Sequence, residues 1–95
     1  MAEISYGVQI AQTHKMKEEL SEFCIRIEQR MTALNELLQQ CVSQGLPAET
    51  AQRYYQNYYA PDRQNISEFL QIVQKKHVEY LDGIIAILRR LVDEQ

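Results

Sequence analysis

Apolar side chains recur along the last third of the chain at the spacing of a helix. Two interleaved rows, each repeating every seven residues and apolar except at one histidine, consist of Ile66, Leu70, Val73, His77, Tyr80, Ile84, Ile87 and Leu91. Such a pair of rows forms the apolar seam of a long amphipathic helix. The spacing predicts a helix over residues 62–93 whose seam packs inside the chain.

A second apolar row follows the first along the same helix. Its members are Leu81, Ile85, Leu88 and Val92. A helix that exposes one face to solvent needs only one such row to pack against the rest of the protein. We therefore expect this second row to bind a protein partner, either a helical domain of a larger protein or a second copy in a homodimer. The alternative is a third helical segment of the same chain that covers it.

The first half of the chain contains another helical pattern. Apolar residues separated by steps of three and four are Met16, Leu20, Phe23, Ile27, Met31, Leu34, Leu38 and Cys41. Charged residues fill the positions between them, which is typical of a helix that packs along one face. We expect a helix over residues 8–43 with this row in the core.

The two halves meet at a turn over residues 44–47. Gly45 can adopt the left-handed conformation that ends a helix, and Pro47 is suited to the start of the next one. A connection this short makes neighbouring helices antiparallel. The predicted fold class is therefore all-α, an antiparallel helical hairpin that forms one domain over residues 1–95.

Pro61 interrupts the second half of the hairpin. Proline removes the hydrogen bond to the carbonyl of Asn57, four residues earlier, and disfavours helical geometry at Ala60. Either a kink or a break is expected there. We predict a short helix over residues 48–59 and a long helix over residues 62–93, nearly collinear.

Four of the six tyrosines lie within six residues just before this proline, namely Tyr54, Tyr55, Tyr58 and Tyr59. Tyrosine offers a large, stiff contact surface and is enriched in protein interfaces. The cluster is predicted either to bind the partner or to form a boundary layer against the first helix.

Composition narrows the range of functions. The 95 residues carry a net charge of −3, which does not favour nucleic-acid binding. No apolar run resembles a signal peptide or a membrane span, so we expect no membrane insertion, and a protein that is cytoplasmic or exported without a cleaved signal peptide. Cys24 and Cys41 lie 17 residues apart on one predicted helix, about 25 Å, and cannot bridge within it.

The sequence offers no pattern of catalysis. The two histidines have no cysteine or histidine neighbour at metal-binding spacing, and the three glycines are isolated. No nucleophile is paired with a base. We expect no enzyme activity, no catalytic residues, no metal and no cofactor, and we expect His77 to be a core or boundary residue of the seam.

This layout resembles the WXG family, small helical proteins of type VII secretion. The family's tryptophan, variable residue and glycine at the hairpin turn correspond here to Ser43-Gln44-Gly45, with the glycine alone retained. The run Ala51 to Tyr59 is similar to the small and aromatic residues that open the family's second helix. The family's C-terminal signal is an aromatic residue followed four residues later by an acid. The C-terminal part of this chain lacks it, because the residue four positions after Tyr80 is Ile84.

With these departures the chain resembles a related group more than it resembles the WXG proteins themselves. An example of such a group is the helical proteins that pair with the N-terminal domain of LXG toxins. The resemblance implies a type VII secretion partner, targeting factor or small substrate. A cytosolic helical adaptor, regulator or chaperone-like homodimer with no secretion role is the alternative.

Overall fold

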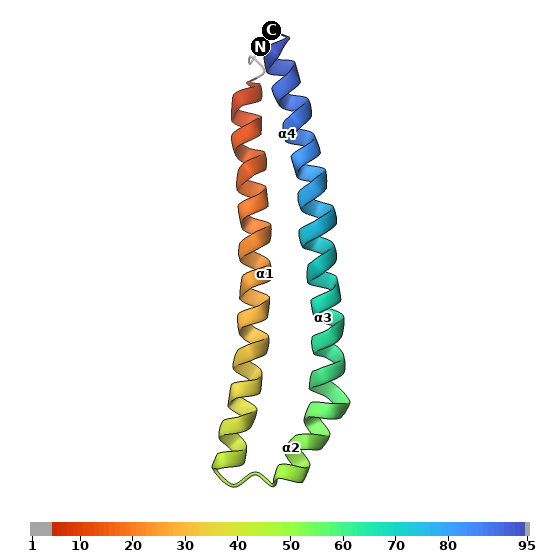
Figure 1. Ribbon diagram of the computed structural model, residues 1–95. Coiled ribbons are helices and arrows are strands. Elements are labelled where there is room, and N and C mark those ends of the chain that lie inside the picture. The colour runs from red at the N-terminus through yellow and green to blue at the C-terminus, as the bar shows by residue number, and fades with distance from the viewer. Residues whose placement is uncertain (1–4, 95) are drawn as a thin grey trace. The chain divides into compact units, whose positions relative to one another are not determined.

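The computed structural model describes residues 5–94, and these form helices joined by one short turn, with no strand (Figure 1). The predicted fold class, an all-α helical hairpin, is confirmed. The helices in chain order are α1 (Tyr6–Ser43), α2 (Ala48–Tyr54), η1 (Tyr55–Tyr59), α3 (Ala60–Ile72), η2 (Val73–His77) and α4 (Val78–Asp93), where η1 and η2 are π-helical turns.

The turn has the geometry predicted from its glycine. Gly45 has a φ of +117°, a conformation that favours glycine because it has no Cβ. The amide of Leu46 donates to the carbonyl of Cys41 at 2.9 Å, and that of Gly45 donates to Val42 at 3.1 Å. This pair of bonds is a Schellman motif, which satisfies carbonyls that the end of α1 would otherwise leave open. Helix α2 then begins immediately after Pro47.

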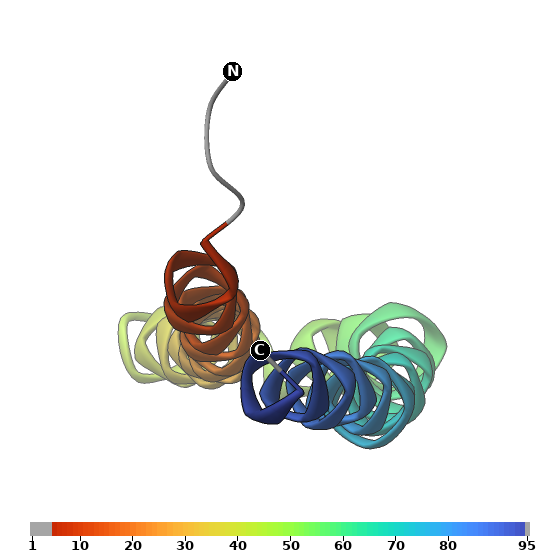
Figure 2. The ribbon, with the colours of Figure 1, turned by 90° about the horizontal axis from the view of Figure 1, so that it is seen from above.

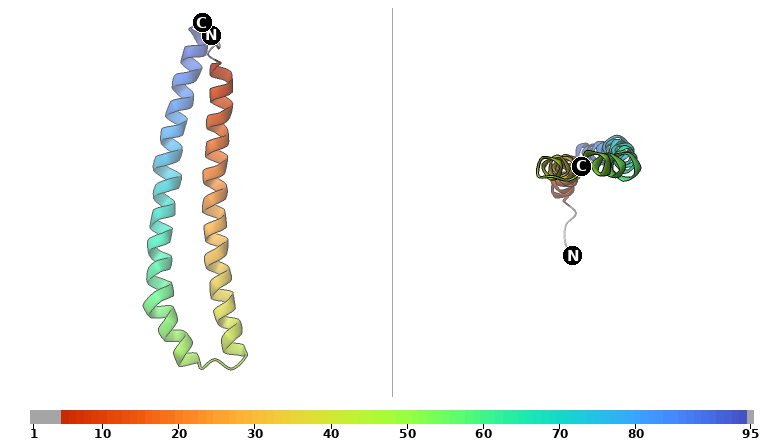
Figure 3. Two further views of the ribbon diagram at one scale, coloured as in Figure 1. Left: turned by 180° about the vertical axis from the view of Figure 1, so that it is seen from behind. Right: turned by 90° about the horizontal axis from the view of Figure 1, so that it is seen from below.

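The chain divides into two compact units, which are described separately. Unit 1 consists of Met1–Phe23 and Ile72–Gln95, and unit 2 of Cys24–Gln71. Within unit 1 the first part of α1 and helix α4 lie side by side (Figure 2). Within unit 2 the remainder of α1 is joined through the turn to α2, η1 and α3 (Figure 3).

Unit 2 is held by apolar burial and by two specific polar contacts. Its buried residues are Cys24, Met31, Ala51, Tyr59 and Leu70. The hydroxyl of Tyr59 donates to the backbone carbonyl of Met31 at 2.7 Å, inside the core. At the edge, Arg63 pairs with Glu28 at 2.7 Å. Because both contacts join residues far apart in sequence, they fix how the two sides of this unit align.

Unit 1 buries one residue of α1 and a row that runs from η2 into α4. The buried residues are Thr13, Val73, Leu81, Ile85 and Leu88. Thr13 is tolerated there because its hydroxyl donates to the carbonyl of Gln9 at 2.8 Å, one helical turn earlier. An ion pair between Lys17 and Asp82 joins the helices along one edge of this buried row.

Helical geometry continues through Pro61, so the helices predicted as separate at 48–59 and 62–93 are joined. The π-turn η1 ends two residues before the proline, and the amide of Ala60 donates to the carbonyl of Tyr55, five residues back. A π-turn widens the helix locally, which accommodates a ring that would clash with the carbonyl four residues earlier. The ribbon changes direction where α2 gives way to α3 (Figure 1).

A candidate binding groove in unit 1

Helix α4 carries two adjacent apolar rows, and unit 1 buries the one that was expected to bind a partner. Leu81 is 5% exposed and Ile85 is 4% exposed, and Leu88 is buried beside them. The prediction that these three residues bind a partner is therefore wrong, because their side chains pack inside the chain. Val92, the fourth member of that row, is exposed.

The row that was expected to form the seam faces outward instead. Tyr80 is 74% exposed and Ile87 is 51% exposed, while Ile84 and Leu91 are half-buried between the two rows. We call these four residues the outer row. They keep the four-three-four spacing of a coiled-coil seam, so α4 presents a regular helical seam to the outside of unit 1.

The π-turn η2 explains the exchange of rows. Val73, at its start, is buried, and the next buried residue after it is Leu81, eight residues later instead of seven. A π-turn holds roughly one more residue than an α-turn. That extra residue rotates everything after His77 by about 100°. The continuous heptad of the sequence is thus buried before η2 and turned outward after it.

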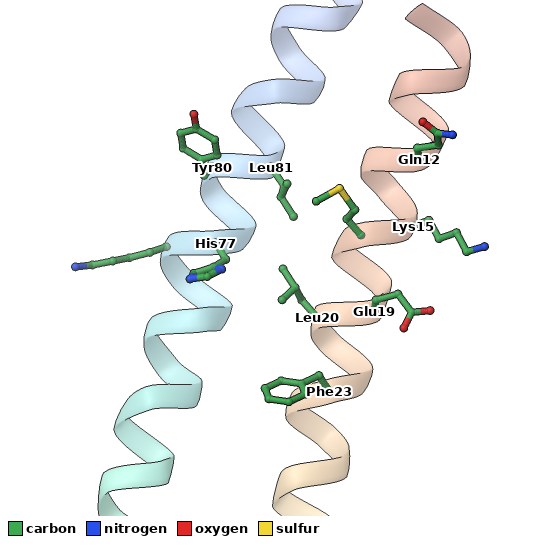
Figure 4. A pocket seen from close by; sticks show the side chains of 10 residues that line it. Gln12, Lys15, Glu19, Leu20, Phe23, His77, Tyr80 and Leu81 are labelled. Carbon is green, nitrogen blue, oxygen red and sulfur yellow. The ribbon is translucent and has the colours of Figure 1, made fainter.

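A groove of about 1030 Å³ lies between the first part of α1 and the η2 to α4 segment (Figure 4). Its apolar lining consists of Met16, Leu20, Phe23, Tyr80 and Leu81. Leu20 and Leu81 point into the space between the helices and form the floor, whereas Tyr80 projects outward from α4 as part of the rim (Figure 4). The groove reaches the upper end of the size range of small-ligand pockets, about 300–1,000 Å³, and it is open along its length.

The groove's edges carry more positive than negative charge. Lys15, Glu19 and Lys76 line it, and Lys15 and Glu19 project outward from α1 (Figure 4). His77 lies in the groove and is exposed, so the expectation that it is a core or boundary residue of a buried seam is not met. Across the described part of the chain, neither Lys15 nor Lys76 is in an ion pair.

Met16 and Phe23 were predicted to lie in the core and instead line the groove as exposed residues. The buried row of α1 is rotated by about one residue from the predicted one, so that Thr13 and Cys24 are buried in place of Met16 and Phe23. The larger side chains of Met16 and Phe23 are left exposed. Sequence reasoning missed this arrangement because threonine is mostly an exposed residue and does not look like a core position beside methionine.

The tyrosine cluster, which belongs to unit 2, is divided by the structure. Tyr59 is 8% exposed and bonded to Met31, so this tyrosine is a core residue. Tyr54, Tyr55 and Tyr58 are exposed; Tyr54 stacks on Tyr58 with ring centroids 6.1 Å apart, and Tyr55 stacks on Tyr59 at 5.3 Å. The boundary-layer alternative therefore fits Tyr59, while the other three remain accessible.

Both cysteines are free. Cys24 packs in unit 2 as a small buried residue, whereas Cys41 is exposed. Within residues 5–94, no group of histidine, cysteine, aspartate or glutamate side chains has the arrangement of a metal site. In the same part of the chain, no helix combines the length and the apolar character that crossing a membrane requires.

Comparison with known proteins finds no match, whether to a family model, to a curated protein or to a solved structure. The resemblance to the WXG family stays a prediction.

Proposed function

We propose that this chain is a non-enzymatic helical interaction protein that binds a helical segment of another protein in the groove of unit 1. The observation that carries this proposal is the exposure of Met16, Phe23 and Tyr80 along the groove, and of Ile87 farther along α4, although unit 1 has already buried Leu81, Ile85 and Leu88. Large exposed apolar surfaces mark interaction sites. Aromatic side chains such as Tyr80 and Phe23 frequently supply most of the binding energy of an interface.

The resemblance to WXG proteins suggests a setting for this interaction. In that setting the chain is a type VII secretion partner or targeting factor, made in the cytoplasm, and the bound segment belongs to a secreted helical protein such as an LXG toxin. The complex then either delivers its partner or leaves the cell with it, without a cleaved signal peptide. Genes adjacent to this one provide the first candidates for the partner.

The test is co-expression of the chain with the helical domain encoded by each neighbouring gene, followed by co-purification through a tag on the chain. We expect one such domain to co-purify with the wild-type chain and to be lost with the double variant Phe23→Asp and Tyr80→Asp. The matched control is the double variant Ile25→Asp and Leu37→Asp, which adds the same two charges at exposed apolar residues that do not line the groove.

Circular dichroism must show that all variants remain helical. A partner that co-purifies equally well with the groove variant would overturn the proposal, because its binding would not depend on the groove. Loss of the partner with the Ile25 and Leu37 control as well would do the same, since the effect would then follow from added charge alone.

A further inference from the structure

The two sides of α4 in unit 1 differ in how their charges are satisfied. On the side away from the groove, Asp82 is paired with Lys17 of α1. Lys76, which lines the groove, and Arg90, farther along α4, are exposed and, within the described residues, have no ion pair. Positions 83 and 90 lie seven residues apart in α4 and so follow one edge of the outer row, and Lys76 precedes them in η2.

The residue between these two cations is Gly83. A Cβ placed on Gly83 would meet nothing within 4 Å. The edge therefore presents two separated positive charges with open space between them. In helical pairs, charges at such flanking positions select the partner and its orientation.

The outer row defines the shape of what can bind beside it. From Tyr80 to Leu91 the row covers 12 residues, or about 17 Å of helix. Its four-three-four spacing accepts the knobs of another helix that repeats every seven residues. Met16 and Phe23 form the opposite wall of the same groove, so one helix can contact both sides at once.

We infer that the groove of unit 1 binds a single amphipathic helix whose apolar heptad row is bordered by aspartate or glutamate. This inference rests on the proposed function and specifies the chemistry of the partner. An acidic border would pair with Lys76 and Arg90 along α4 and with Lys15 on the rim of α1. A second copy of this chain would instead bring a groove edge with two cations, Lys15 and Lys76, and one anion, Glu19, against an identical edge. Like charges opposed across an interface disfavour that complex.

The probes are two fluorescent helical peptides of about three heptads, identical in their apolar positions and bordered by glutamate in one and lysine in the other. Anisotropy titrations with the full chain should show the glutamate peptide binding at least about tenfold more tightly, with a preference that shrinks as salt is added. The variant Lys76→Glu with Arg90→Glu should reverse this preference.

The chain supplies a matched control. Lys75 and Arg89 are exposed neighbours of the two edge residues but point to the other side of the helix. The variant Lys75→Glu with Arg89→Glu makes the same change in net charge, and it should keep the preference for the glutamate peptide to within about twofold.

Three results would overturn the inference: equal binding of both peptides, binding of neither, or a dimer of the chain alone that Tyr80→Asp dissociates. The first leaves the proposed function standing if Tyr80→Asp abolishes binding of both peptides, because the groove then binds helices without selecting their charge. Binding that survives Tyr80→Asp contradicts the groove itself and thus the proposed function.

Discussion

Tyr58 and Tyr59 are adjacent residues of the same type that differ in exposure and in hydrogen bonding. Tyr58 is 64% exposed and has only a stacking partner, Tyr54. Tyr59 is buried, and its hydroxyl bonds to a carbonyl of the opposite helix. A buried hydroxyl without such a partner would be costly. The bond to Met31 is therefore the reason that a tyrosine, with its polar end, is compatible with the core of unit 2.

Replacing Tyr59 with phenylalanine tests this bond directly. The change removes only the hydroxyl, so the ring still fills its place in the core. We expect the free energy of unfolding to fall by about 1 kcal/mol, the usual contribution of one intramolecular hydrogen bond. The measurement is urea denaturation followed by circular dichroism.

Tyr58→Phe is the control for this experiment. Since that hydroxyl has no hydrogen bond to any of the described residues, its loss should change stability by no more than about 0.5 kcal/mol. Equal effects of the two substitutions would mean that the contact between Tyr59 and Met31 adds nothing to stability.

At the scale of the element, η2 decides which side of α4 is buried. The sequence predicts the hairpin turn correctly, because Gly45 and Pro47 each have a local conformational preference that does not depend on the rest of the fold. It does not predict the faces correctly. The heptad that runs from Ile66 to Leu91 is regular in the sequence, and a π-turn leaves no signature in such a pattern.

The same limit explains why the candidate groove was not found beforehand. On α4, Tyr80 and Leu81 are neighbours and both suit a core, so hydrophobicity cannot choose between them. Packing chooses the branched aliphatic row, which leaves the tyrosine outside. The sequence does contain one signal, the two apolar rows on a single helix. These rows indicate that two surfaces of the helix are covered. They do not indicate which of the two is covered by the chain itself.

Deletion of Gln74 tests the role of η2. Gln74 is exposed within the π-turn, and its removal brings Val73 and Leu81 to the seven-residue spacing of an ordinary helix. The buried row should remain continuous, so we expect stability to change by less than about 1 kcal/mol. Circular dichroism during urea denaturation measures this.

Deletion of Gly83 is the control, because it also removes one exposed residue but lies beyond the π-turn. It would move Arg89 into the buried position of Leu88. An unpaired charge in the core should cost at least ~3 kcal/mol and unfold unit 1. If both deletions lower the stability of the chain equally, the extra residue of η2 is needed for folding. The interpretation of that residue as a tolerated insertion would then be wrong.

At the scale of the whole molecule, each unit completes a core of its own, and unit 1 leaves a second apolar surface outside its core. A chain of this length has a small margin of stability, so substitutions that touch its core should be separable from those that touch only the groove side. Ile85 and Ile87 allow that separation, because they are the same residue type, two positions apart, on opposite sides of the boundary.

We predict that Ile85→Asp unfolds unit 1, because it buries an unpaired carboxylate. Ile87→Asp should keep helix content and change stability by no more than about 0.5 kcal/mol, while it abolishes binding of the partner helix. Circular dichroism and size-exclusion chromatography of the complex measure the two effects. If the Ile85 variant stays folded but no longer binds, the buried row of Leu81, Ile85 and Leu88 belongs to the interface after all.

The π-turn also has a consequence for how such a protein can diverge. Because it places folding and recognition on separate rows of α4, substitutions at Tyr80 or Ile87 can accumulate without loss of the hairpin, whereas Leu81 and Leu88 cannot change freely. Copies of the gene are then able to acquire new partners while retaining an unchanged scaffold. Among descendants of this chain, we expect the buried residues Leu81, Ile85 and Leu88 to stay constant. The outer row beside them should vary together with the helix that each descendant binds.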